Sequence, residues 1–288
     1  MKELVVMSGK GGTGKTTVTG AFAMLAENIM VADADVDAAN LQFLLQPSMT
    51  STESFSGGSL AVLDPEVCAG CGLCTRHCRF DAFVFEDDKP VVDETRCEGC
   101  GACVIVCPQN AIHLEPRLTG FWHEGAGRSG RAVYARLEPG AENSGKLVAK
   151  VRARALEIAR ETGADLLLTD GPPGLGCPAI AALAGADAVL VVAEPTPSGA
   201  QDALRLIGLA AHFGVPVQLC VNKWDLHPAL ADTLEADATA AGATICPRLR
   251  YDRAVTDALM QGRTAVETDA PIASDIRALW QSVRKTVM

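Results

Sequence analysis

A glycine-rich stretch near the amino terminus constrains the fold of this chain more than any other feature. It runs from Ser8 to Thr17 and reads Ser-Gly-Lys-Gly-Gly-Thr-Gly-Lys-Thr-Thr. An apolar segment, Leu4–Met7, precedes it, and a segment with helical character, Val18–Ala26, follows it. Glycines let backbone N–H groups approach a phosphate without a Cβ in the way, and the start of a helix adds a favourable dipole. The order strand, loop, helix therefore predicts a phosphate-binding loop.

The spacing from Gly9 to Thr16 is G-x4-G-K-T, which is the P-loop pattern. In this pattern Lys15 is placed to reach the β- and γ-phosphates of a nucleotide, and the Thr16 hydroxyl can ligate Mg²⁺. Thr17 is placed for a further phosphate contact. The residues expected to bind the nucleotide here are Gly9, Lys10, Gly11, Gly12, Thr13, Gly14, Lys15, Thr16 and Thr17.

Acidic residues follow two other apolar runs. Asp33 and Asp35 come directly after the run at 28–32, and Asp170 follows the run at 165–169. The carboxyl ends of parallel strands meet at one edge of a sheet, so these carboxylates are expected beside the P-loop. Asp170 and the glycine-rich segment after it look like Walker B and switch II. Asp170 is then expected in the Mg²⁺ shell, and Gly174 is expected to offer its N–H to the γ-phosphate.

The rest of the chain alternates short apolar runs with helical segments. Apolar runs lie at 132–137, 189–193 and 215–221, and helical segments lie at 144–162, 178–184, 198–213 and 229–241. This alternation predicts an α/β fold with a doubly wound, mostly parallel sheet of the P-loop NTPase type. The Ser-, Thr- and Gly-rich stretch at 47–59 is expected to be a surface loop. The amphipathic segment 272–287 is expected to be a terminal helix packed on the core, with membrane docking as the alternative.

Eight of the 11 cysteines fall in two runs with the same spacing, C-x2-C-x2-C-x3-C. This repeat is typical of bacterial ferredoxins with two [4Fe–4S] clusters, in which the fourth cysteine of each run ligates the other cluster. One predicted set is Cys68, Cys71, Cys74 and Cys107. The other predicted set is Cys97, Cys100, Cys103 and Cys78. The predicted organisation is a small α+β ferredoxin-like insert at 61–115 within a discontinuous ATPase domain at 1–60 and 116–288.

Zinc is the alternative ligand for these cysteines, but zinc ribbons pair C-x2-C motifs roughly 12–20 residues apart, which two complete four-cysteine runs match poorly. Pro108 follows the second run as in ferredoxins, whereas Arg79 follows the first. The cation suggests a raised potential for the adjacent cluster or a contact with an acidic partner. Cys177, Cys220 and Cys246 lie outside the runs, and packing is the simplest expectation for them.

Composition restricts the remaining possibilities. The formal net charge is −10 and aromatic residues make up 5% of the chain, which argues against nucleic-acid binding. No apolar run approaches the roughly 18 residues that a membrane span needs, and the start of the chain does not resemble a secretory signal. A cytoplasmic location is therefore expected. In that reducing compartment, cysteines are read as metal ligands or thiols rather than as a disulfide framework.

The segment from Lys10 to Thr17 resembles the deviant Walker A motif of the MinD/ParA/NifH superfamily of ATPases. The resemblance implies that Lys10 reaches across a dimer interface to the partner's nucleotide, although a solvated loop lysine is the alternative. It also aligns Asp35 with the aspartate that orients the attacking water and Asp33 with one near Mg²⁺. Asn222, in the stretch Asn-Lys-Trp-Asp, resembles the base-recognition residue of this superfamily. That stretch alone leaves guanine open, whereas the deviant Walker A favours ATP.

Taken over nearly its whole length, the chain resembles a MinD-superfamily ATPase with an inserted two-cluster ferredoxin domain. The resemblance implies ATP, Mg²⁺ and two [4Fe–4S] clusters as cofactors, and a homodimer or a heterodimer with a related ATPase. Three functions follow as expectations. The first is nucleotide-gated electron transfer to a redox partner protein. The second is Mrp-like assembly of a metal or iron–sulfur cofactor in a partner. The third is a positioning ATPase with structural or redox-sensing clusters.

Overall fold

The computed structural model describes residues 1–86, 89–139, 141 and 144–287. The chain divides into two compact units. The larger unit comprises Met1–Glu53, Trp122–Arg136 and Ser144–Met288, and we call it the ATPase unit after the domain that the sequence predicts there. The smaller unit comprises Ser54–Phe121 and Leu137–Asn143, and we call it the insert. It extends beyond both ends of the predicted 61–115 segment because two long strands run continuously through those boundaries.

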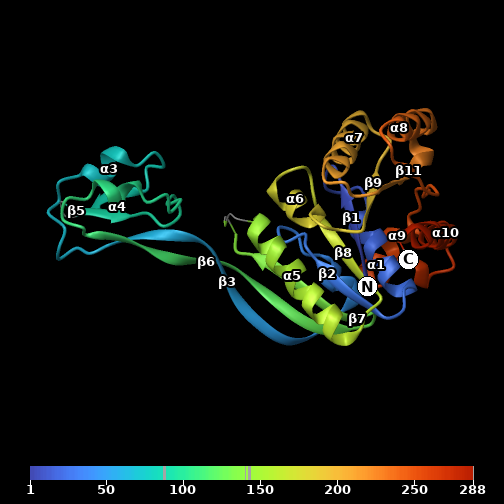
Figure 1. The fold of residues 1–288 in the computed structure, drawn as a ribbon, viewed down its shortest axis with the longest axis horizontal. Coiled ribbons are helices and arrows are strands. Elements are labelled where there is room, and N and C mark those ends of the chain that lie inside the picture. Colours follow the sequence, from blue (N-terminus) through green and yellow to red (C-terminus); the bar gives the residue numbers. More distant parts are fainter. Residues whose placement is uncertain (87–88, 140, 142–143, 288) are drawn as a thin grey trace. The chain divides into compact units, whose positions relative to one another are not determined.

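Strands and helices alternate along most of the chain (Figure 1). The strands are β1 (Lys2–Ser8), β2 (Ile29–Asp33), β3 (Ser48–Leu63), β4 (Phe83–Glu86), β5 (Lys89–Val92), β6 (Ile112–Gly127), β7 (Gly130–Leu137), β8 (Leu166–Pro173), β9 (Ala188–Ala193), β10 (Val217–Val221) and β11 (Thr244–Ile245). The α-helices are α1 (Lys15–Leu25), α2 (Leu41–Leu45), α3 (Leu73–His77), α4 (Ala102–Val106), α5 (Ser144–Thr162), α6 (Cys177–Leu183), α7 (Pro197–His212), α8 (Pro228–Ala240), α9 (Ala254–Met260) and α10 (Pro271–Val287). Two 3₁₀ segments, η1 (Trp224–Leu226) and η2 (Ala265–Glu267), complete the set.

Within the described residues, nine strands form one sheet in the order β11-β10-β9-β1-β8-β2-β7-β6-β3. The pairs from β11 through to β7 are all parallel. The predicted doubly wound, mostly parallel sheet is therefore confirmed. The carboxyl ends of β1, β2 and β8 lead to the P-loop, to Asp33 and to Asp170, so three separate segments of sequence converge on one edge.

Alternate residues of the central strands pack against the helices. Leu4 and Val6 of β1 belong to the core cluster that includes Phe22 of α1 and Trp280 of α10. The rings of Phe22 and Trp280 lie 4.9 Å apart, centroid to centroid. The apolar side of α10 is buried, which confirms that the C-terminal helix packs on the core. No helix among the described residues is both long and apolar enough to cross a membrane.

The prediction of a surface loop at 47–59 was wrong, because this stretch forms most of strand β3. Most of its side chains are exposed, so hydrophobic alternation gives little signal there. Its partner in the sheet is β6, which lies far along the sequence. Hydrogen bonds such as the one from Thr50 Oγ1 to the carbonyl of Glu124, at 3.1 Å, therefore come from tertiary pairing rather than from local preference.

The insert repeats one local structure. Gly72 and Gly101, which precede α3 and α4, adopt positive φ angles of 67° and 79°. Asp81 and Asn110, each three residues after the last cysteine of a run, have φ angles of 51° and 52°. The internal repeat in the sequence is therefore also a repeat in the backbone.

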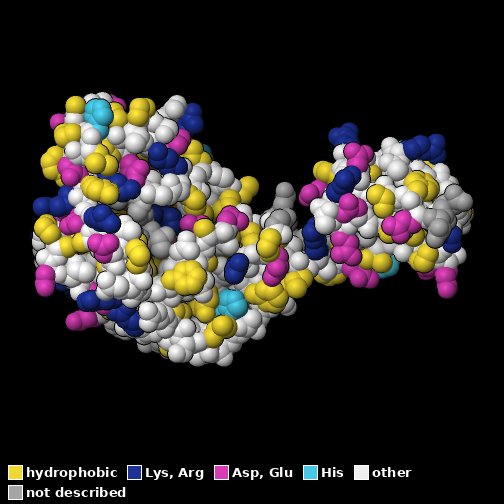
Figure 2. Space-filling model, turned by 180° about the vertical axis from the view of Figure 1, so that it is seen from behind, with side chains coloured by type: hydrophobic (Ala, Val, Ile, Leu, Met, Phe, Trp, Pro, Cys, Tyr) yellow, Lys and Arg dark blue, Asp and Glu magenta, His cyan; other side chains and the backbone are white. Residues whose placement is uncertain are grey.

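Figure 2 shows acidic, basic and apolar side chains interspersed over one face of each unit.

Candidate functional site

The P-loop joins β1 to α1 and is held from the opposite side by Asn222. Gly14 has a φ of 94°, and a Cβ at this position would lie 2.4 Å from the Asn222 side-chain nitrogen, Nδ2. This nitrogen donates a 2.7 Å hydrogen bond to the carbonyl of Thr13. Only glycine satisfies both constraints at Gly14. The same loop contains Gly9, Gly11 and Gly12, and the first turn of α1 contains Thr17, as the motif predicts.

A buried charge network lies at the end of the P-loop. The ammonium nitrogen of Lys15 is 3.0 Å from Asp170 Oδ1 and 3.1 Å from Asp35 Oδ2. Thr16 donates a hydrogen bond of 2.7 Å to Asp170 Oδ2, and Thr19 donates one of 2.9 Å to Asp170 Oδ1. The structure thus brings together the predicted phosphate-binding lysine, the predicted Mg²⁺ ligands Thr16 and Asp170, and the acidic residue expected to orient water.

Burial and charge shift the pKa values in this network. Burial alone would lower the pKa of Lys15, but the carboxylates of Asp170 and Asp35 outweigh it, and the pKa of Lys15 is raised. Burial, together with the nearby charge of Asp170, raises the pKa of Asp33 well above its ordinary value. Burial also raises the pKa of Asp35, although Lys15 opposes this shift. The site therefore crowds several carboxylates around one cation, an arrangement that a bound divalent cation would relieve.

Asp33 holds the segment that follows β2. Its Oδ1 accepts a hydrogen bond from the backbone N–H of Asp35 at 3.2 Å, and its Oδ2 accepts one from the N–H of Leu41 at 3.1 Å. Leu41 is the first residue of α2, so Asp33 satisfies one of the free donors at the start of that helix. Asp33, which is expected near Mg²⁺, thus also fixes the position of the first residue of α2.

Two buried polar atoms beside the P-loop have no hydrogen-bond partner among the described residues: Thr13 Oγ1 and Asp35 Oδ1. An orphaned buried oxygen is costly unless a ligand or an ordered water completes it. Carboxylate and hydroxyl oxygens are also the donors that Mg²⁺ prefers. The residues present therefore fit a nucleotide phosphate with Mg²⁺ and water. Thr16, Asp33 and Asp170 would hold the ion, which would neutralise charge on the phosphates.

Lys10 and Gly174 have partners within the chain. Lys10 Nζ lies 3.0 Å from Thr196 Oγ1 and 3.3 Å from Ser198 Oγ, at the start of α7. The N–H of Gly174 donates a 2.9 Å hydrogen bond to the carbonyl of Ser8. The predicted contacts of Lys10 with a partner's nucleotide and of Gly174 with a γ-phosphate both require these bonds to break.

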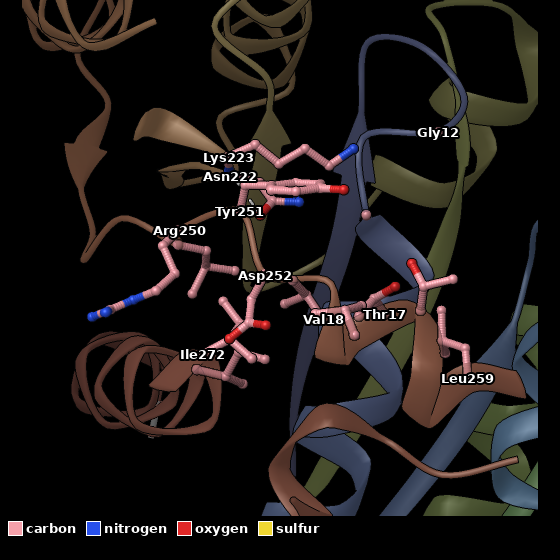
Figure 3. A pocket seen from close by; sticks show the side chains of 15 residues that line it. Gly12, Thr17, Val18, Asn222, Lys223, Arg250, Tyr251, Asp252, Leu259 and Ile272 are labelled. Atoms are coloured by element: carbon pink, nitrogen blue, oxygen red, sulfur yellow. Dashed lines mark hydrogen bonds between the residues drawn. The ribbon is translucent and has the colours of Figure 1, made fainter. Parts of the chain in front are cut away.

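A cavity of about 200 Å³ opens beside the P-loop (Figure 3). Its lining combines P-loop residues with residues from the C-terminal part of the chain. These are Gly12, Gly14, Thr17, Val18, Asn222, Lys223, Leu249, Arg250, Tyr251, Asp252, Val255, Thr256, Leu259, Ile272 and Ile276. Figure 3 shows Arg250 directed out of the cavity, where it pairs with Asp275. The lining combines polar side chains with apolar ones, which suits a nucleobase.

The aspartate of the Asn-Lys-Trp-Asp stretch is engaged elsewhere. Asp225 Oδ1 accepts a 2.7 Å hydrogen bond from the backbone N–H of Tyr251. Asp225 is absent from the cavity lining, whereas Asn222 and Tyr251 are both part of it. One of the two carboxylate oxygens of Asp225 is therefore engaged, and the side chain does not line the cavity in which it would read the donors of a guanine edge. Sequence reasoning did not assign the cavity residues after Leu249, because only tertiary folding brings them to the P-loop.

The eight cysteines of the repeat line two separate cavities. Cys68, Cys71, Cys74 and Cys107 line one, which we call the first cysteine set. Cys97, Cys100, Cys103 and Cys78 line the other, which we call the second cysteine set. These are the two groups that the spacing predicts, with the fourth cysteine of each run exchanged. Among the described residues, no three His, Cys, Asp or Glu side chains converge closely enough for a single metal ion.

Backbone N–H groups donate to the cysteine sulfurs. Ala82 donates to Cys78 Sγ at 3.5 Å, and Ala111 donates to Cys107 Sγ at 3.3 Å. In each case the donor lies four residues after the acceptor. Such donors stabilise the negative charge of thiolates around a cluster. The donor set and these N–H groups therefore fit two [4Fe–4S] clusters.

The remaining cysteines lie outside both sets. Cys220 and Cys246 are buried, and burial raises the pKa of both thiols, as expected for packed core residues. Cys177 is exposed at the start of α6. Its backbone carbonyl and Cβ pass close to Gly145, where an added Cβ would be 3.2 Å from Cys177 Cβ.

Fold and site together define a class: a MinD/ParA-like P-loop ATPase fold that carries a pair of 4Fe–4S binding domains. The family model of the 4Fe-4S binding domain matches residues 61–84 and 90–113, one four-cysteine run in each. A chain of the Aquifex aeolicus MinC:MinD cell division protein complex aligns with a TM-score of 0.58 and 19% identity, over 99% of this chain and 96% of that chain. MinD from Pyrococcus horikoshii, in complex with Mg-ADP, aligns with a TM-score of 0.56 and 17% identity, with the same coverage of each chain. Similarity at this level of identity establishes the fold.

The particular family follows from a nearer relative. The uncharacterized protein MJ0578 of Methanocaldococcus jannaschii is 33% identical over 226 residues, which are 77% of this chain and 78% of that protein. The chain belongs to the family of this protein.

Proposed function

We propose that the protein binds and hydrolyses ATP and that its nucleotide state gates electron transfer through two [4Fe–4S] clusters to a partner protein. In this proposal Lys15 neutralises phosphate charge, and Thr16 and Asp170 hold Mg²⁺, with Asp33 near it. Asp35 orients the attacking water through Oδ1, which has no hydrogen-bond partner within the part of the chain that the structure describes. The Mg-ADP complex of the P. horikoshii MinD relative supports a magnesium nucleotide at the P-loop.

Adenine is the proposed base. One hydrogen of Asn222 Nδ2 is used by the Thr13 carbonyl, and Asn222 Oδ1 accepts a 3.0 Å bond from the N–H of Lys223. A second hydrogen and a second lone pair remain for a base edge. Asp225, which would read guanine, does not line the cavity, and one of its oxygens accepts a bond from Tyr251. These contacts favour ATP over GTP.

The gating proposal rests on hydrogen bonds that connect the nucleotide site, through α2, to the strands that lead into the insert. Asp33 anchors the first residue of α2. At the other end of this helix, the carbonyl of Leu45 accepts a 3.1 Å bond from the N–H of Arg128, and the carbonyl of Leu44 accepts a 3.3 Å bond from its guanidinium. Arg128 directly follows β6, and β3 begins just after α2. A change at Asp33 would therefore move the ends of both strands that continue into the insert.

Dimerisation is part of the same proposal. Lys10 would leave Thr196 and Ser198 to reach the nucleotide of a related protomer, in a homodimer or a heterodimer, and would neutralise charge on the transferred phosphoryl group. Such a contact in trans contributes roughly 10³–10⁵ in rate in other P-loop enzymes. The A. aeolicus relative was solved in a MinC:MinD complex, which favours a partner-binding role for this fold.

A second candidate is ATP-dependent assembly of a metal or iron–sulfur cofactor. It is favoured by the exposure of one ligand in each set, Cys71 and Cys100. Exposed ligands are accessible to an acceptor protein. Clusters that stay bound while their oxidation state cycles would favour electron transfer. Loss of iron to an acceptor protein without a cluster, on addition of ATP, would favour assembly.

The experiment is electron paramagnetic resonance (EPR) of the anaerobically purified protein, reduced with dithionite, with and without Mg-ATP. We expect ATP to change the cluster signal or its potential. In Arg128→Ala, hydrolysis should persist while the spectral response to ATP falls. Arg136→Ala, at an exposed position of β7, serves as the matched control. An unchanged spectrum in the presence of ATP, with hydrolysis intact, would favour a positioning ATPase and refute gating.

A further inference from the structure

Backbone N–H groups donate to the sulfurs of both cysteine sets. In each set, two sulfurs accept such a hydrogen bond at 3.3–3.5 Å from the described residues, in addition to the N–H groups beside Cys74 and Cys103. In the first set, Gly70 donates to Cys68 at 3.4 Å and Ala111 donates to Cys107 at 3.3 Å. In the second set, Ala61 donates to Cys97 and Ala82 donates to Cys78, both at 3.5 Å. Backbone donors are a major determinant of cluster potential, and here they are balanced.

The side chains at equivalent positions of the repeat are not balanced. Gln109 lines the first cavity, and its counterpart in the other run, Phe80, lines the second. Ala69 lines the first cavity, and its counterpart, Glu98, lines the second. One cavity therefore has a neutral amide and a methyl group where the other has an apolar ring and a carboxylate.

Both differences act in the same direction. Reduction adds a negative charge to a cluster, so a neighbouring carboxylate such as Glu98 opposes it. The Gln109 amide carries two N–H donors that can stabilise the added charge, whereas the Phe80 ring offers none. Arg79 acts in the opposite sense, but it does not line the cavity of the second set, whereas Glu98 does. A charge that lines the cavity acts on the cluster over a shorter distance than one that does not.

We infer that the two clusters have unequal potentials, with the cluster of the first set (Cys68, Cys71, Cys74 and Cys107) the easier to reduce. The first electron that enters the fully oxidised protein from a one-electron donor then resides on that cluster, and the second electron enters the cluster of the second set. Gln109, Phe80, Ala69 and Glu98 are the residues that set the difference. The inference rests on the proposed clusters, and it reverses the effect expected of Arg79 from sequence.

The test is a stepwise anaerobic titration of the full chain with dithionite, followed by EPR. We expect two one-electron steps whose equilibrium constants differ at least about tenfold, which is about 59 mV for a one-electron couple. Glu98→Ala and Phe80→Gln should each raise the potential of the second step. Gln109→Phe should lower the potential of the first step. Arg79→Pro, which restores the residue of the other run, should leave the order of the steps unchanged.

Iron analysis distinguishes failure of this inference from failure of the proposed function. A protein with two clusters per chain and a single reduction step would overturn the inference while leaving the proposed electron-transfer function intact. A protein that binds no iron–sulfur cluster would overturn the proposed function itself. If Phe80→Gln fails to hold iron, Glu98→Ala still decides the inference, because the Glu98 side chain is exposed and its truncation removes little packing. An unchanged separation of the steps in Glu98→Ala and Gln109→Phe would also refute it.

Discussion

The ATPase unit and the insert are stabilised by different kinds of core. In the ATPase unit, aliphatic side chains of the parallel strands pack against α1 and α10, with large buried residues such as Phe22 and Leu166. In the insert, the buried cluster is small, and three of its members are cysteines: Cys74, Cys97 and Cys103. A core built from metal ligands depends on the metal, because binding and folding are then coupled. Apolar packing therefore stabilises the nucleotide site of the ATPase unit, whereas the fold of the insert is expected to depend on bound clusters.

The largest expected effect is on catalysis in the ATPase unit. Lys15→Gln removes the only cation in contact with Asp35 and Asp170 among the described residues. We expect a loss of ATP hydrolysis of about 10²–10³-fold, measured as phosphate release, because the developing phosphate charge is no longer stabilised. The visible absorption of the clusters should be unchanged, since the insert does not depend on this site.

One control variant and one further catalytic variant accompany Lys15→Gln. Lys2→Gln removes an exposed lysine of the same unit, paired with Asp187, and should leave hydrolysis unaffected. Asp35→Asn should still bind ATP but hydrolyse it slowly. Normal turnover in Asp35→Asn would refute the role assigned to this carboxylate.

The next effect is on the integrity of the insert. Cys103→Ser removes a buried ligand of the second set. We expect the iron content to fall by about half, since one of two clusters is lost. Limited proteolysis of the full chain should then cut within 54–121 while the ATPase unit stays protected. Cys177→Ser, at an exposed cysteine outside both sets, is the control. An insert that resists proteolysis equally without iron would show that its small apolar core suffices.

The smallest effect is a dependence of stability on pH in the nucleotide-free ATPase unit. Burial and the charge of Asp170 raise the pKa of Asp33 above its ordinary value of 3.8. A raised carboxyl pKa means that the folded state holds the proton more tightly, so the stabilisation is present below pH 3.8 and is lost as pH rises through the raised pKa. The pKa of Lys15 is raised from 10.5, so its contribution is retained across this window.

Thermal melting of the full chain at a series of pH values checks this prediction. The transition temperature of the ATPase unit should fall as pH rises, by about 2–4 °C for each kcal/mol lost. Mg-ATP should reduce the fall, because bound cation relieves the crowded carboxylates. Asp33→Asn should flatten the profile. A profile that is already flat in the nucleotide-free protein would contradict the raised pKa of Asp33.

Much of the site was predictable because local sequence forms it. The P-loop from Gly9 to Thr17 is contiguous, and the spacing of each cysteine run brings its first three ligands together. The exchange of Cys78 and Cys107 between sets was also predicted, because it belongs to the repeat. The strand at 48–63 was missed, since its hydrogen bonds come from a distant partner and its side chains show little alternation.

The sequence by itself determined the α/β class, the phosphate loop, the acidic residues at the strand ends and the two cysteine sets, because each depends on spacing within one segment or on the periodicity of a parallel sheet. Only the tertiary structure decided how these parts are connected. It brings Tyr251 and Asp225 together, anchors α2 between Asp33 and Arg128, and lines one cluster cavity with Gln109 and the other with Phe80 and Glu98. These contacts join residues far apart in the chain or select among exposed side chains, and neither spacing nor periodicity encodes them.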